Sequence, residues 1–168
     1  MNKTLRALLG AALLAISGLA AADTLVTAVD AKNNSIAGGV GGADSFILVA
    51  NSTFSVTATG TWQNDPNPAY LSDANGHANS TYTYDGSTFD IGALVGQIAN
   101  GAYFLVGTSL LNASTGAGGQ LKLFYWDSDA YNNLGQVEAT VSAVPEPMNV
   151  ALMALALGAF ALTRRRKA

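Results

Sequence analysis

Residues 121–141 read LKLFYWDSDAYNNLGQVEATV, and this stretch says most about the fold. Its first part, residues 121–126, is a run of apolar and aromatic residues of the kind that favours β-structure. Near its end Val137, Ala139 and Val141 alternate with polar neighbours, which is typical of a strand with one face in a core. The stretch therefore predicts two strands joined by a loop that is rich in Asp and Asn.

The rest of the middle region follows the same pattern. Alternation at residues 54–59 and β-prone runs at 93–98 and 103–106 predict further strands. Clusters of Gly, Asn, Asp and Pro separate these runs, and no long run at helical spacing occurs between residues 23 and 143. We therefore expect an all-β domain, a small antiparallel β-sandwich of jelly-roll-like type.

The N-terminal 22 residues have the layout of an export signal. Lys3 and Arg6 give a positive start, an apolar run follows, and small residues precede a cleavage point after Ala22. A short membrane anchor is the alternative, but the apolar run is below the roughly 20 residues that a spanning helix needs. We predict a signal peptide at residues 1–22 and a mature chain that begins at Asp23.

The C-terminal segment, residues 144–168, reads VPEPMNVALMALALGAFALTRRRKA. Its apolar run of 15 residues at 148–162 would reach about 22 Å against a bilayer core of about 30 Å, which makes a marginal transmembrane helix. Cations that close such a segment stay on the cytoplasmic side and hold the folded part outside. The residues that define the segment are Pro145, Glu146, Pro147, Arg164, Arg165 and Arg166.

A Pro-Glu-Pro motif, a short hydrophobic helix and an Arg-rich end in this order resemble the PEP-CTERM sorting tail. The resemblance implies an exosortase substrate that is anchored transiently in the inner membrane and then reaches the cell surface or the extracellular space. It also implies a bacterium that makes extracellular polysaccharide. An ordinary C-terminal membrane anchor is the alternative, and either one leaves residues 23–143 outside the cytoplasm.

The charges of the middle region limit its partners. Between residues 23 and 143, Lys32 and Lys122 stand against ten Asp and Glu, a formal charge of about −8. A nucleic-acid partner needs a basic surface, so we exclude nucleic acid. The chain has no cysteine, which excludes disulfides, thiol catalysis and cysteine metal sites.

Residues 126–135 concentrate oxygen ligands in one predicted loop. Calcium takes six to eight oxygens from carboxylates, amides and backbone carbonyls, and Asp127, Asn132 and Asn133 can supply several of them. The spacing is not that of an EF-hand loop. Asp and Asn also crowd into ordinary surface turns, so the loop by itself leaves both interpretations open.

Three segments together resemble the calcium-dependent galactophilic bacterial lectins: residues 55–62 (SVTATGTW), 91–101 (IGALVGQIANG) and 121–141. The resemblance implies a jelly-roll-like β-sandwich in which Asp127, Asn132 and Asn133 bind calcium. In this scheme Asp127 and Asn132 also contact the sugar. The His and Gln sugar contacts of the family have no firm counterpart here, and His77 is the candidate for the first.

Trp62 could stack on a sugar ring, or it could fill the edge of the core, as a tryptophan at a strand end often does.

The Asp- and Asn-rich loop, the lectin resemblance and the sorting tail together favour a calcium-dependent carbohydrate-binding protein linked to exopolysaccharide or biofilm matrix. The alternative is a structural matrix protein with no small-molecule ligand. We do not expect an enzyme, because the chain has no cysteine nucleophile and no suitable nucleophile elbow for its single histidine. The neighbouring Asp127 and Asp129 suit ligands or solvated charges better than glycoside cleavage.

Overall fold

The two strands predicted within residues 121–141 are β10 (Gly119–Tyr125) and β11 (Leu134–Val144), and they belong to different sheets. These elements come from a computed structural model that describes residues 22–38 and 40–144. The loop between β10 and β11 therefore passes from one sheet to the other. It is the loop for which the sequence predicts calcium ligands.

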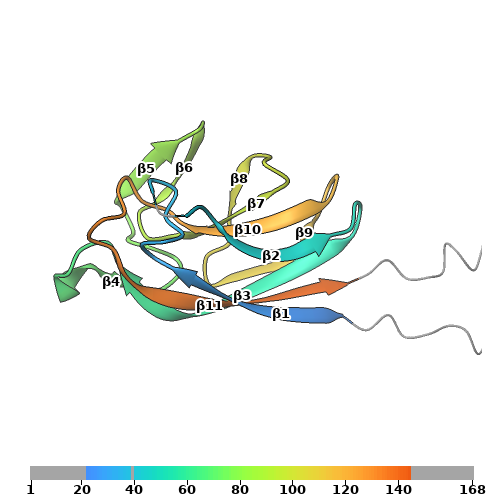
Figure 1. Ribbon diagram of the computed structural model, residues 1–168, viewed down its shortest axis with the longest axis horizontal. Helices are drawn as coiled ribbons and strands as arrows, with labels where there is room; N and C mark the ends of the chain where they lie inside the picture. Colours follow the sequence, from blue (N-terminus) through green and yellow to red (C-terminus); the bar gives the residue numbers. More distant parts are fainter. Residues whose placement is uncertain (1–21, 39, 145–168) are drawn as a thin grey trace, which may run out of the picture. The chain divides into compact units, whose positions relative to one another are not determined.

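Two antiparallel sheets form the domain (Figure 1). The larger sheet has the order β1-β11-β3-β4, and β9 pairs with the same edge of β3 as β4 does. The smaller sheet has the order β2-β10-β7-β8. The remaining elements are β1 (Asp23–Asp30), β2 (Ala43–Leu48), β3 (Thr53–Gln63), a 3-10 turn η1 (Pro68–Tyr70), β4 (Leu71–Ser72), β5 (Thr81–Tyr84), β6 (Ser87–Asp90), β7 (Leu94–Ile98), β8 (Tyr103–Leu105) and β9 (Ser109–Ser114).

The core lies between the two sheets. The alternating residues of β11 that the sequence assigned to a core face, Val137, Ala139 and Val141, have no exposed surface. Facing residues of β10, such as Leu121 and Leu123, belong to the same apolar cluster. Burial of a side chain of this size contributes about 1.5–3 kcal/mol. The predicted all-β, antiparallel sandwich is confirmed.

A separate hairpin, β5–β6, covers a second apolar cluster that contains Val95, Phe124 and Trp126. Its turn is Asp85-Gly86, and both residues have positive φ (47° and 74°). Such a two-residue turn matches the twist of the strands on either side, and Asp-Gly is a favoured pair for it. Figure 1 shows this hairpin at the same end of the domain as the loop between β10 and β11.

Both ends of the described chain leave from the other end of the sandwich. Asp23 pairs with Ala143 at the start of β1, whereas Asp30 pairs with Gln136 close to the loop. Figure 1 shows the loop at the left and these chain ends at the right. The predicted signal peptide up to residue 21 and the sorting residues from Pro145 onward lie outside the described residues. Within the described part, no helix is long and apolar enough to cross a bilayer.

Candidate functional site

Asp127 follows β10 and is almost completely buried, with 4% of its surface exposed. Burial raises the pKa of its carboxyl group. The backbone N–H of Ser128, 2.6 Å from Oδ1, and the Asn133 side chain lower this pKa in part, whereas the charge of Asp129 raises it further. Among the described residues, Asp127 has no cationic partner. A buried carboxylate in this situation is costly unless it takes up a proton or a cation.

Asn133 is buried, and its hydrogen bonds fix the orientation of its amide. Nδ2 donates to the carbonyl oxygens of Ala31 at 3.1 Å and of Asp129 at 3.0 Å. Because both donor positions are used, Oδ1 is the free end of the amide, and it is buried without a hydrogen-bond partner. Oδ1 of Asn132 is buried and unpartnered in the same way. Two amide oxygens of this loop thus have unused acceptor capacity.

Asn64 contributes a third such oxygen, which the sequence analysis did not identify as a site residue. It directly follows β3, whose last residue, Gln63, pairs with Leu134 at the start of β11. Asn64 and Asn133 are the residues that adjoin this last pair of the ladder. Its Oδ1 is also buried without a hydrogen-bond partner. No sequence signal distinguishes this asparagine from others in turns, because its neighbour is set by strand register.

Unpartnered polar atoms gather at this end of the sandwich. Trp62 of β3 pairs with Ser72 of β4 and with Gly135 of β11, and its ring lies 4.5 Å from that of Tyr125, centroid to centroid. Of seven buried side-chain polar atoms without a partner in the described part, six are in or beside these elements. They belong to Asn64, Ser72, His77, Tyr125, Asn132 and Asn133. Such groups are usually satisfied by protein, water or an ion, so this end of the sandwich is the candidate site.

His77 lies in this region as part of the chain between β4 and β5. Its backbone N–H donates to Ile91 O at 2.8 Å, and its ring meets Tyr70 edge to face at 6.2 Å. Nε2 is buried and unpartnered. Gly92 has φ +82°, and a Cβ there would lie 3.0 Å from Ser72 Oγ and 3.5 Å from His77 Cδ2. The close approach of Gly92 thus places the two unpartnered side chains beside each other.

Trp62 differs from the expectation of a sugar contact. It has no exposed surface, and its indole N–H donates to Asp73 O at 3.1 Å and to Gly92 O at 2.8 Å. No ring face is available for a sugar in this arrangement. Trp62 occupies the core, which was the alternative interpretation, and it anchors the turns at Asp73 and Gly92 to β3.

The donor set suits a hard cation. No three His, Asp or Glu side chains come together in the described part of the chain, so a metal site here has to use amide oxygens. Asp127, Asn132, Asn133 and Asn64 offer only oxygens. Calcium prefers such ligands, whereas zinc prefers nitrogen and sulfur. The residues present therefore fit calcium, with Asp127 as the charged ligand.

Comparison with known proteins gives a result at the level of the fold. A solved structure described as the N-terminal domain of EclA, a PllA-like lectin, matches with a TM-score of 0.50. The two chains are 23% identical, and the match covers 71% of this chain and 94% of that one. The fold of the described domain is lectin-like. No protein-family profile and no curated protein matches the sequence.

Proposed function

We propose that this chain is a calcium-dependent carbohydrate-binding protein, exported to the cell surface or beyond and linked to exopolysaccharide or biofilm matrix. The observation that carries the proposal is the set of unpartnered amide oxygens of Asn64, Asn132 and Asn133 at the end of the sandwich where Asp127 is buried. The likeness in fold to a PllA-like lectin supports the proposal, since the match covers 94% of that lectin domain.

Calcium would be held by Asp127, Asn132, Asn133 and Asn64. The ion would supply the positive charge that the buried carboxylate lacks, and the three amide oxygens would gain the partner that they lack. Four side chains leave part of a shell of six to eight oxygens open. Backbone carbonyls, water or two adjacent sugar hydroxyls can complete it.

The sugar would be recognised through this open part of the shell. Asp127 and Asn132 are the residues that we expect to contact both the ion and the sugar hydroxyls. His77 Nε2 and Ser72 Oγ are further polar atoms without partners in the same region. Trp62 takes no part in this scheme because it is buried.

Export and sorting complete the proposal. The signal peptide would direct the chain out of the cytoplasm, and the C-terminal helix would hold it in the inner membrane until an exosortase processes the tail at Pro145–Pro147. The binding loop lies at the opposite end of the domain from Ala143. A domain held through its C-terminus would therefore carry the loop on the far side from its attachment.

A calcium titration of the purified protein tests the proposal. Calcium at about 100 times its Kd should raise the free energy of unfolding by about 2.7 kcal/mol, because the ion binds the native state. Magnesium should have a smaller effect, since it demands a tighter octahedral shell. Asp127→Asn should abolish the response. Asp85→Asn removes the same charge at an exposed turn position and should respond like the parent protein.

A glycan array with and without calcium tests the second half of the proposed function, which is carbohydrate binding. Binding of a neutral hexose that disappears on chelation supports the proposal. Absence of a thermal response to calcium in the parent protein would overturn the metal site. A calcium response with no glycan bound in any condition would leave a calcium-stabilised matrix protein instead.

A further inference from the structure

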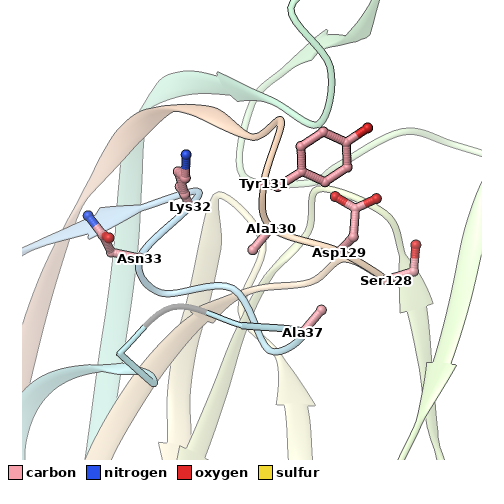
Figure 2. Close-up of a pocket in the computed structure, with 7 residues that line it drawn as sticks. All are labelled: Lys32, Asn33, Ala37, Ser128, Asp129, Ala130 and Tyr131. Atoms are coloured by element: carbon pink, nitrogen blue, oxygen red, sulfur yellow. The ribbon is translucent and has the colours of Figure 1, made fainter.

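A pocket lies between the proposed calcium loop and the turn that follows β1 (Figure 2). Its volume is about 430 Å³, within the usual range of small-molecule sites. The residues that line it are Lys32, Asn33, Ala37, Ser128, Asp129, Ala130 and Tyr131. Four of these are the residues between Asp127 and Asn132, so the pocket and the proposed calcium ligands share one loop.

The backbone of both walls is fixed by hydrogen bonds. The Asp30 carboxylate accepts from the backbone N–H groups of Lys32 at 3.0 Å and Asn33 at 2.7 Å. On the opposite wall, the Asp129 carbonyl accepts from Asn133 Nδ2 at 3.0 Å. Asn133 thus links the pocket wall to the proposed calcium site. A wall held in this way loses little conformational entropy on binding.

The side chains of the pocket remain available for a ligand. Those of Lys32 and Asn33 provide donors and an amide acceptor, and Asp129 provides a carboxylate acceptor, none of them in a hydrogen bond with another described residue. Figure 2 shows Lys32 and Asn33 on one side of Ala130, and Asp129 and Tyr131 on its other side. The Tyr131 side chain is 77% exposed and offers a ring face.

This combination matches a sugar. Hydroxyl groups need both donors and acceptors, and the C–H face of a pyranose ring packs on an exposed aromatic ring. The lining has one positive and one negative charge, in a domain whose formal charge is about −8. A carboxylated sugar would meet Asp129 as well as Lys32, so a neutral sugar fits better.

We propose that this pocket is a second sugar subsite, which takes a neutral hexose residue of the same polysaccharide chain that engages the calcium site. The proposal rests on the proposed function. Because Asp127 and Tyr131 are four residues apart, their Cα atoms lie within about 15 Å of each other. The protein then recognises a chain of several sugars better than a single one.

The test compares methyl glycosides of galactose, glucose and mannose with the corresponding neutral tetrasaccharides, by isothermal titration calorimetry with calcium present. We expect at least one tetrasaccharide to bind tenfold or more tighter than its methyl glycoside. Tyr131→Ala and Lys32→Gln should remove most of this gain and leave affinity for the methyl glycoside within twofold. Tyr131→Phe should keep the gain because the ring remains. Lys122→Gln, the matched control outside the pocket, should behave like the parent.

Three results of these titrations would overturn the second subsite. No tetrasaccharide binds tenfold tighter than its methyl glycoside, Tyr131→Ala weakens the tetrasaccharide and the methyl glycoside equally, or tetragalacturonate binds better than the neutral tetrasaccharides. If no sugar binds at all, the subsite and the sugar half of the proposed function fail together. The calcium thermal shift then shows whether the metal site survives. A methyl glycoside that binds without any tetrasaccharide gain rejects the subsite alone.

Discussion

Asp127 combines near-complete burial with a carboxyl group that has no cationic partner in the described chain. Replacing it by Asn keeps the shape and removes the charge. We expect Asp127→Asn to raise the Tm of the calcium-free protein by about 2–6 °C, because a buried charge is removed. The same variant should lose the calcium-induced rise in Tm. Differential scanning calorimetry with chelator and with calcium measures both effects, and a calcium-free Tm well below that of the parent would contradict the prediction.

The pH dependence of stability follows from the raised pKa of Asp127. Its ordinary value is 3.8, and the native value is higher because of burial. The native state therefore binds this proton more tightly than the unfolded state does. The contribution to stability is fully present below pH 3.8 and is lost as pH rises through the native pKa.

Calcium should invert this behaviour, since the ion needs the ionised carboxylate. We expect the calcium-free parent to gain stability relative to Asp127→Asn as pH falls through that window, and the calcium affinity of the parent to weaken over the same range. Urea unfolding at a series of pH values, with chelator and with calcium, measures both trends. Parallel pH profiles of the parent and the variant without calcium would show that Asp127 is not the group responsible.

Asn64 is the proposed calcium ligand that the sequence did not indicate. We expect Asn64→Ala to weaken calcium binding by about tenfold, because the variant loses one oxygen of the shell, which corresponds to about 1.4 kcal/mol. Without calcium its stability should change little. Gln136→Ala, which removes an exposed amide on β11, is the control. Unchanged calcium affinity of Asn64→Ala in a titration would exclude Asn64 from the shell.

At the scale of the elements, Trp62 ties β3 to two turns of the site. We expect Trp62→Phe to lower the free energy of unfolding by about 2–4 kcal/mol, because a large buried ring shrinks and the carbonyls of Asp73 and Gly92 lose their donor. Urea denaturation measures this change. A variant with parental stability but without sugar binding would instead assign Trp62 to the ligand.

Strand prediction succeeded where one face of a strand is buried and the other is exposed. In β11, Val137 and Val141 are buried while Glu138 is exposed, so the alternation was visible. In β1, at the edge of its sheet, the consecutive Leu25 and Val26 are both exposed, which hides the period of two. The sequence therefore predicted no strand at β1. It also predicted none at β2, β4, β5, β6 or β9.

The site was predictable only within a single loop. Asp127, Asn132 and Asn133 are close in sequence, and the structure keeps them in one loop between the two sheets. Asn64 became a candidate only through the pairing of Gln63 with Leu134, which depends on strand register between residues 71 positions apart in the chain. Whether a tryptophan at a strand end is buried is likewise a property of the packed sheets, so Trp62 could not be assigned from sequence.

For the whole molecule, the loop and the chain ends lie at opposite ends of the sandwich, and the sequence has no cysteine. A single introduced cysteine therefore attaches the protein to a surface at a chosen point. We expect protein coupled through Thr24→Cys, at the end where the chain leaves, to bind glycan from solution as the free protein does. Coupling through Ser128→Cys, in the binding loop, should abolish binding because the surface covers the site. Surface plasmon resonance with calcium measures both, and equal glycan binding by the two couplings would place the sugar site away from this end of the domain.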